Sequence, residues 1–319
     1  MSIKFHLPDF AVHYNFNRVF LAMLKNCPEY FHDGLEIASF YGTFPQSLWN
    51  GGRLMSGVCD KKSAKAIVNE FDKLGIPLRF TFTNPTLKEE ELKDDFCNYI
   101  LRIAENGING VIVVSPILEQ YIREKYPKYK ITSSTCKRIT DMDMLNTELE
   151  NNYDIVVLDY DFNNKFDQLE KIKNKSICEI LVNACCQPNC PNRKQHYNDI
   201  GNVQRAICQY VASRSRVPFD KKRYKVTDEN SDKCPYMVYD AADVKKHSTH
   251  ITPKDILEKY VPMGFEQFKI EGRTASVFNL AEYYIYYMVK PEYQDKARLV
   301  FYDQLVRNEI ISTSLPGGM

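Results

Sequence analysis

The sequence predicts an α/β protein built as a (β/α)8 barrel of the TIM type. Short apolar runs rich in β-branched and aromatic residues alternate with longer amphipathic stretches, and the alternation repeats eight times. Alternating strands and helices predict a parallel sheet, and eight repeats favour its closure into a barrel. An open, doubly wound sheet is the alternative, but no G-x-G-x-x-G follows the first strand and there is no Walker loop.

The predicted strands occupy residues 3–7, 35–42, 77–83, 110–115, 129–134, 154–160, 179–183 and 265–271. Helical patterns lie between them, for example at 61–75, 88–107 and 117–126. Gly75 and Gly107 stand where helices are expected to end before the next strand. Thr252, Pro253 and Asp255 form an N-terminal capping pattern. The aromatic-rich segment after residue 275 is expected to form helices that pack on the barrel.

The interval between the seventh and eighth strands is too long for one barrel connection. We therefore expect residues 184–264 to hold an inserted, cysteine-containing subdomain. Residues 1–183 would then carry strands 1–7, and residues 265–319 would carry the last strand and the C-terminal helices. The whole chain is expected to form one structural domain.

Charge and hydropathy exclude some classes of protein. The chain of 319 residues has 42 basic and 41 acidic residues, so no global field would recruit nucleic acid. No apolar run approaches the roughly 18 residues of a membrane-spanning helix, and the start lacks a signal-peptide layout. A cytoplasmic location is therefore expected. Because thiols stay reduced there, the ten cysteines are not a disulfide framework.

Half of the cysteines gather in one stretch of the chain that begins directly after the seventh strand. They are Cys185, Cys186, Cys190, Cys208 and Cys234. Active sites of such barrels lie at the carboxyl ends of the strands, so the first three would stand at the active face. Prolines at 188 and 191 exclude a regular helix through this part.

Spacing alone leaves the chemistry of these cysteines open. Cys186, Cys190, Cys208 and Cys234 supply four thiolates, enough for an iron–sulfur cluster or a zinc ion, with Cys185 as an alternative to Cys186. The C-x2-C pairs typical of zinc ribbons are missing, and the C-x3-C pair matches a redox dithiol poorly. A nucleophilic cysteine beside His196 and a site without metal are the other interpretations.

Three segments resemble the peptidase family U32, also called the collagenase-like peptidases. They are "VNACCQPNCPNRKQHY" (182–197), "CPYMVYDAADV" (234–244) and "MGFEQFKIEGRTAS" (263–276), in which "FKIEGR" is the most specific match. The resemblance covers mainly residues 179–276. "FTFTNP" (80–85) also looks like the family's strand that ends in Asn.

The resemblance implies a cofactor and an activity. Members of this family include peptidases of unassigned catalytic type. Others take part in oxygen-independent hydroxylation of ubiquinone precursors or RNA bases and hold a 4Fe–4S cluster on four cysteines. The implied ligands here are Cys186 (or Cys185), Cys190, Cys208 and Cys234. The surroundings of Cys208, "AICQYVAS", are equally typical of a buried helix.

Polar residues at the strand ends are the candidates for catalysis. Glu271 and Arg273 alternate along the last strand, so both side chains should point the same way and pair. Asp159 and Asp161 share one side at the end of the sixth strand, where they would hold a cation, divide acid and base roles, or cap the next helix. His196 is the remaining candidate.

Candidates for substrate binding lie close to these groups. Asn84 and Asn183 close their strands and offer hydrogen bonds, although asparagine is also common in turns. Arg193 and Tyr197 follow the cysteine pair.

The expected function is oxygen-independent hydroxylation, or a related modification, of an aromatic or nucleobase substrate by an iron–sulfur barrel protein. A peptidase of unassigned catalytic type is one alternative, although no Ser/His/Asp arrangement or H-E-x-x-H is visible. A non-catalytic interaction protein stabilised by zinc is the other. The expected partners are a small-molecule, RNA or peptide substrate, an electron donor and a second subunit of the same family.

Overall fold

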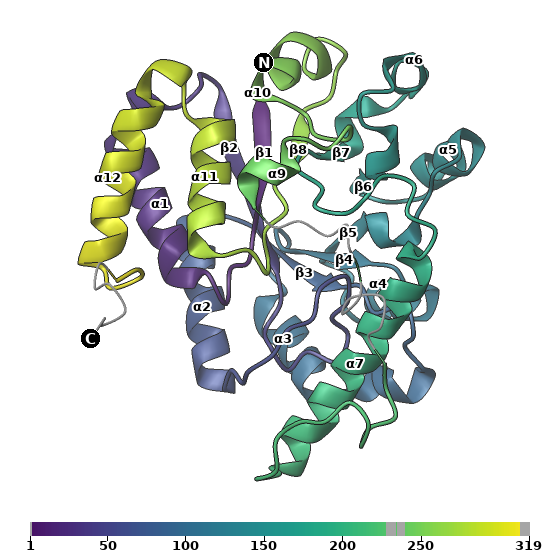
Figure 1. Ribbon diagram of the computed structural model, residues 1–319. Coiled ribbons are helices and arrows are strands. Elements are labelled where there is room, and N and C mark those ends of the chain that lie inside the picture. The colour runs from purple at the N-terminus through teal and green to yellow at the C-terminus, as the bar shows by residue number, and fades with distance from the viewer. Residues whose placement is uncertain (1, 228–233, 235–239, 313–319) are drawn as a thin grey trace.

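Eight parallel strands close into a barrel in the computed structural model, which describes residues 2–227, 234 and 240–312 (Figure 1). The strands follow one another in chain order around the barrel, and β8 pairs with β1 to close it. The (β/α)8 class predicted from the alternation is therefore confirmed. The strands are β1 (Ile3–Pro8), β2 (Leu35–Gly42), β3 (Leu78–Phe82), β4 (Gly110–Val113), β5 (Lys130–Ser133), β6 (Ile155–Val157), β7 (Cys178–Leu181) and β8 (Gln267–Lys269).

Helices follow the strands and surround the barrel (Figure 1). They are α1 (Tyr14–Asn26), α2 (Lys61–Leu74), α3 (Asp95–Ala104), α4 (Pro116–Lys125), α5 (Met142–Glu150), α6 (Phe166–Leu169), α7 (Arg193–Ser213), α9 (Ala241–Val244), α10 (Pro253–Asp255), α11 (Val277–Met288) and α12 (Gln294–Arg307). Short helical turns that matter below are η2 (Glu89–Lys93), η4 (Tyr160–Phe162) and η6 (Ile256–Tyr260).

Local capping explains several of the helix ends. Gly75 ends α2 in the left-handed conformation (φ 68°), as predicted. The Thr252–Asp255 capping box at the start of α10 is also confirmed. Gly107 is not a helix terminus, because α3 already ends at Ala104. The helix predicted at 88–107 is divided into η2 and α3, because the Asp94 side chain accepts from Cys97 N and starts a new helix.

The C-terminal helices pack on the start of the chain, as the aromatic pattern predicted (Figure 1). Phe20 of α1 contacts Tyr284 of α11 with ring centroids 4.6 Å apart. Phe16 lies 5.2 Å from Phe301 of α12. Buried aromatic pairs of this kind add attraction beyond the area they bury, so α11 and α12 close the outside of the barrel beside α1.

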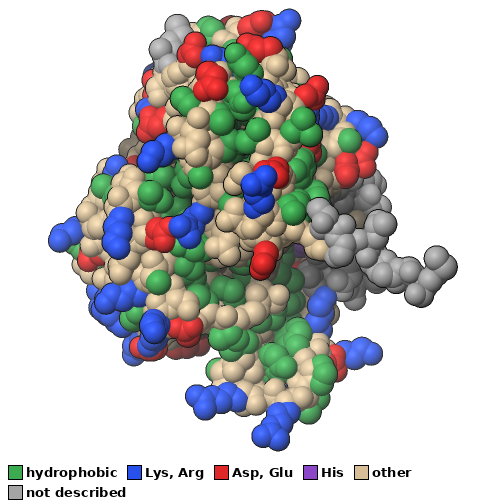
Figure 2. Space-filling model, turned by 90° about the vertical axis from the view of Figure 1, so that its left-hand side faces the viewer, with side chains coloured by type: hydrophobic (Ala, Val, Ile, Leu, Met, Phe, Trp, Pro, Cys, Tyr) green, Lys and Arg blue, Asp and Glu red, His purple; other side chains and the backbone are tan. Residues whose placement is uncertain are grey.

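Charge is spread unevenly over the surface. Figure 2 shows the side on which α12 lies, where acidic and basic side chains are interspersed, and a projection at the bottom that is rich in Lys and Arg. In the same place Figure 1 shows the end of α7 and the segment that follows it. Residues 214–225 of this segment hold six basic residues and one acidic residue. None of the helices in the described ranges is both long and apolar enough to span a bilayer.

A charged cluster fills the barrel interior. Glu179 of β7 is fully buried and pairs with Arg79 of β3 and, at 3.1 Å, with Lys269 of β8. Burial opposes its ionisation, but these two cations hold the pKa of Glu179 well below its usual range. His6 of β1 lies 3.4 Å away, and burial lowers its pKa to about 4, so it is neutral.

We expect Glu179→Gln to lower the free energy of unfolding by about 3–5 kcal/mol, because Arg79 and Lys269 would remain buried without their anion. Urea unfolding measures this change. Glu266→Gln is the matched control. Glu266 pairs with Lys4 at 2.8 Å, but its side chain is 42% exposed, so its loss should cost less than about 1 kcal/mol. Equal costs for the two substitutions would contradict the role assigned to the interior cluster.

Asp9 is a second buried acid, at the carboxyl end of β1. It is fully buried, and its Oδ1 accepts from the backbone N–H groups of Ala11 (3.0 Å) and Val12 (2.8 Å). Its Oδ2 has no hydrogen-bond partner among the described residues. Burial raises the pKa of Asp9 to about 6, although both backbone donors oppose this change.

The raised pKa makes a prediction for stability against pH. Between about pH 4 and pH 6 the unfolded chain ionises Asp9 while the folded chain keeps its proton, so stability falls as pH rises. Asp9→Asn should remove this fall. The difference in free energy of unfolding between Asp9→Asn and the wild type should therefore shift in favour of the variant by on the order of 2–3 kcal/mol as the pH rises over this range. Chemical unfolding at several pH values measures the difference, and parallel pH profiles would count against a raised pKa.

Candidate functional site

The barrel mouth holds a pocket at the carboxyl ends of the strands, where active sites of this fold lie. It encloses about 650 Å³ including its open side. Its walls come from the barrel strands and the segments that follow them, and from α7. The lining residues are Tyr41, Gly52, Arg53, Thr81, Thr83, Ile112, Ser134, Thr135, Cys136, Tyr160, Leu181, Cys186, Tyr197, Lys269, Glu271 and Arg273.

Arg273 ties the end of the barrel to the loop that follows β2. Its guanidinium donates to Asn50 Oδ1 (2.9 Å), Thr81 Oγ1 (2.9 Å) and the carbonyl of Gly51 (2.7 Å). All three acceptors are uncharged, and the side chain is largely buried. Arg273 is therefore a buried cation whose described hydrogen bonds leave its charge without a bonded anion.

Glu271 pairs with Arg53, which lies in the same loop after β2. The predicted pairing of Glu271 with Arg273 is wrong. It assumed strand alternation, but β8 ends at Lys269, and the chain turns before it reaches residue 273. Glu271 Oε2 also accepts from the backbone N–H of Cys185 at 3.1 Å.

Asn183 fixes the backbone of Glu271 in place. Its Nδ2 donates to the Glu271 carbonyl (3.0 Å), and its Oδ1 accepts from the Glu271 N–H (2.6 Å). Asn183 is buried and does not line the mouth pocket, so it positions the carboxylate instead of contacting the pocket itself. The sequence did not reveal Arg53 as a site residue, because an irregular loop has no hydrophobic period. The Gly51–Gly52 pair before it was the one available sign that the backbone approaches another segment closely.

Asp159 and Asp161 hold a guanidinium. Arg193 Nη2 lies 2.7 Å from Asp159 Oδ2 and 3.1 Å from Asp161 Oδ2, and its guanidinium carbon lies 4.3 Å from the centre of the Tyr160 ring. Asp159 also caps η4 by accepting from Asp161 N (3.0 Å). Asp161 Oδ1 accepts from Asn189 N at 2.8 Å. The group therefore anchors the cysteine loop onto the end of β6.

The four predicted metal ligands are not brought together. Cys186 lies in the pocket with Cys190 close by. Cys208 lies on α7, roughly 20 Å along the helix from its first residue, Arg193. Its Sγ is 3.3 Å from the carbonyl of Gln46. Cys234 stands between two stretches that lie outside the described residues, as does most of the "CPYMVYDAADV" motif. In the part of the chain that the structure describes, no three His, Cys, Asp or Glu side chains are grouped to hold a metal ion. The described residues therefore give no support for a four-thiolate cluster, which stays a prediction.

Three thiols in and beside the pocket have raised pKa values. Burial raises the pKa of Cys136 and of Cys186. Burial also raises the pKa of Cys185 far above its usual range, although Arg53 Nη2 lies 2.9 Å from its Sγ.

His196 and Tyr197 lie in the first turns of α7 and not in a loop. Burial lowers the pKa of His196, so its ring is neutral, and its Nε2 has no hydrogen-bond partner within the described ranges. Tyr197 stacks on it with ring centroids 6.5 Å apart and lines the pocket. The structure thus places Tyr197 at the pocket and His196 behind it.

Asn84 holds α7 against the barrel and does not line the pocket. Its Nδ2 donates to the carbonyls of Leu48 (3.1 Å) and Gly201 (3.2 Å). A Cβ on Gly201 would lie 2.3 Å from Asn84 Oδ1, so this close approach requires glycine.

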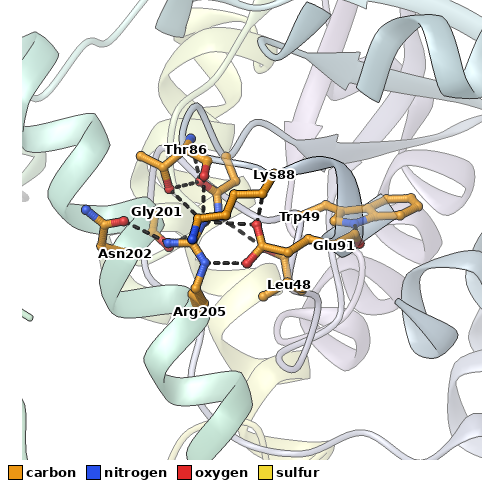
Figure 3. A network of polar contacts seen from close by, with 9 residues as sticks. Leu48, Trp49, Thr86, Lys88, Glu91, Gly201, Asn202 and Arg205 are labelled. Atoms are coloured by element: carbon orange, nitrogen blue, oxygen red, sulfur yellow. Dashed lines mark hydrogen bonds and ion pairs between the residues drawn. The ribbon is translucent and has the colours of Figure 1, made fainter. Parts of the chain in front are cut away.

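A second set of contacts lies one turn further along α7 (Figure 3). Arg205 pairs with Glu91 of η2 and donates to the carbonyl of Thr86, while Trp49 Nε1 donates to the Glu91 carbonyl at 2.8 Å. Helix α7 is thereby fixed to the segments that follow β2 and β3 and forms one wall of the mouth. The inserted subdomain at 184–264 stays a prediction.

Comparison with known proteins confirms the resemblance to the peptidase family U32. The model of Peptidase family U32 matches residues 58–190, a region that ends with the cysteine loop. The motifs that suggested the family lie mainly at 179–276, so the two lines of support overlap around β7 and this loop, and again at residues 80–85.

One solved structure, that of the U32 peptidase Mk0906, is similar over 85% of this chain and 94% of its own, with a TM-score of 0.52 and 12% sequence identity. At that identity the likeness shows a shared fold. Among curated proteins none matches this chain.

The position of Cys208 leads to a prediction for metal content. We expect Cys208→Ala to retain whatever iron, sulfide or zinc the anaerobically purified wild type carries, because this thiol is held at Gln46, away from Cys186. Cys190→Ala, beside Cys186, should lower that content. Elemental and sulfide analysis of the three proteins measures it. Loss of metal from Cys208→Ala, with the fold intact by circular dichroism, would show that the thiols gather in a different arrangement.

Proposed function

From its relationship to the U32 peptidases, we propose that this protein is an enzyme that binds a small substrate with an anionic group and an aromatic ring at the barrel mouth and modifies it there. The observation that carries the proposal is the buried guanidinium of Arg273, which faces the pocket with hydrogen bonds to uncharged oxygens. A charge in such a place is stabilised by an anion that binds beside it.

The balance of charge in the pocket supports an anionic ligand. Arg53, Arg273 and Lys269 line it together with one carboxylate, that of Glu271. Glu271 already pairs with Arg53, and Lys269 pairs with Glu179 beneath the pocket. The lining therefore carries more positive than negative charge, and planar guanidiniums suit carboxylate or phosphate oxygens.

The walls support an aromatic or otherwise planar ligand. Tyr41, Tyr160 and Tyr197 line the pocket from β2, η4 and α7. Tyr41 is fixed because its hydroxyl donates to the carbonyl of Ile270 at 2.7 Å. Aromatic walls with a few placed polar groups are typical of small-molecule sites.

The other activities implied by the family find less support. A cysteine peptidase needs a thiolate, and burial keeps the thiols of Cys136 and Cys186 protonated. The 4Fe–4S cluster, the hydroxylation reaction, the zinc alternative, the electron donor, the RNA or peptide substrate and the partner subunit stay predictions. Among the described residues, no thiols are grouped to hold a metal ion.

Calorimetric titration with benzoate, phenyl phosphate and the neutral benzamide tests the proposal. We expect at least one anion to bind about tenfold or more tightly than benzamide. Arg273→Gln should remove most of this preference, because it takes away the buried guanidinium that bonds only uncharged oxygens. Arg18→Gln is the matched control: Arg18 pairs with Glu70 at 2.8 Å on the outside of the barrel, so ligand binding should not change.

Equal affinities for benzamide and both anions would refute the proposal of an anion site. For the enzymatic part, ligands that bind are incubated with the protein, aerobically and anaerobically, and analysed by mass spectrometry. Unchanged ligand under both conditions would leave a binding protein instead of an enzyme.

A further inference from the structure

We propose that Lys269 is a nucleophilic amine at the floor of the mouth pocket and forms a Schiff base with the carbonyl group of an aromatic oxo acid. This deepens the proposed function, on which it rests for the anionic group of the substrate. The carbonyl chemistry comes from Lys269 alone, so the two proposals can fail separately.

The geometry places this amine where a bound ligand would meet it. Lys269 is the last residue of β8, and its side chain lines the pocket although it is only 7% exposed. Its Nζ lies 4.0 Å from the centre of the Tyr41 ring and 3.1 Å from Glu179 Oε1. Ring and carboxylate fix the long side chain, so the amine is held in position before a ligand arrives.

The groups around Lys269 favour its neutral form. Burial is the main cause, and the cations Arg79 and Arg273 act in the same direction. Glu179 opposes them, while His6 beside Glu179 is neutral. Together they lower the pKa of Lys269 to about 8. At neutral pH this raises the fraction of free amine by roughly 300-fold over an ordinary lysine.

The reaction balances without an oxidant or a reductant. The ammonium group of Lys269 loses a proton to solvent, and the free amine attacks the carbonyl carbon, forming a C–N bond. One amine proton moves to the carbonyl oxygen, which takes back a proton and leaves as water. The product is a protonated imine, so the positive charge beside Glu179 and over the Tyr41 ring is the same before and after.

The anionic group of the substrate has its own place. Arg273 and Arg53 line the same pocket as Lys269 and offer guanidinium donors to a carboxylate. A molecule with a carboxylate, an aromatic ring and a carbonyl carbon therefore uses the guanidiniums, the tyrosines and the amine together. An aromatic oxo acid is the simplest class with all three parts.

Lys137 provides a matched comparison within the same chain. Its Nζ lies 2.6 Å from Glu148 and 4.5 Å from the centre of the Tyr153 ring. Like Lys269, it therefore has a carboxylate and a tyrosine ring of its own beside the amine. Lys137 does not line the mouth pocket. If an ion pair and a ring were enough for reactivity, both lysines would react.

Reductive trapping tests the inference. The full chain is treated at neutral pH with 4-carboxybenzaldehyde and sodium cyanoborohydride, then digested and mapped by mass spectrometry. We expect Lys269 to carry the reduced adduct at least about tenfold faster than Lys137 or the exposed lysines, with a rate that rises as pH approaches 8. Lys269→Arg should abolish the fast labelling and keep the charge beside Glu179, and Lys137→Arg should leave it unchanged.

Labelling spread evenly over the lysines, or the same labelled peptides in Lys269→Arg, would overturn the inference. The wild-type map decides this even if Lys269→Arg does not fold. Benzaldehyde, which lacks the carboxylate, separates the two proposals. Equal labelling of Lys269 by both aldehydes supports the amine and counts against the anion site. Calorimetric binding of 4-carboxybenzaldehyde without adduct at Lys269 overturns the amine and leaves the anion site standing.

Discussion

The pairing of Glu179 with Arg79 and Lys269 is the constraint on which the barrel mouth depends. These residues come from β7, β3 and β8, so one carboxylate joins strands that lie on different sides of the barrel. A buried ion is tolerated only when its partners are close, and the cluster therefore restricts how these strands can shift against one another. The cluster also fixes the position of the Lys269 amine, which lies at the floor of the mouth pocket.

Above this floor, segments far apart in the sequence build the walls of the mouth. Arg273 follows the last strand yet bonds the loop after the second, from which Arg53 reaches back to Glu271. Helix α7 lies against the segment that follows the third strand, through Gly201 and Arg205. Because each polar group is held by a partner from another segment, the site is organised before a ligand binds.

The sequence predicted the barrel because its signal is periodic and local. Each of the eight apolar runs overlaps a strand, and the capping residues at Thr252 lie where their pattern placed them. The candidate site was harder to predict from the sequence, because irregular segments determine where its side chains lie. Arg53 lies in a loop without a period, and the pairing expected of Glu271 failed because its strand ended early. The surroundings of Cys208 suited both a metal ligand and a residue of a buried helix, and the family motif could not decide between the two.

The excess of cations at the mouth also bears on how quickly a ligand arrives. The chain as a whole carries a formal charge of +1, so a distant anion feels almost no attraction. Within about 8 Å, the screening length in physiological salt, the guanidiniums would draw it in and turn it toward the pocket. The mouth would then attract anionic ligands electrostatically, but only at short range. Added salt would slow the capture of anionic ligands far more than it would hasten their escape.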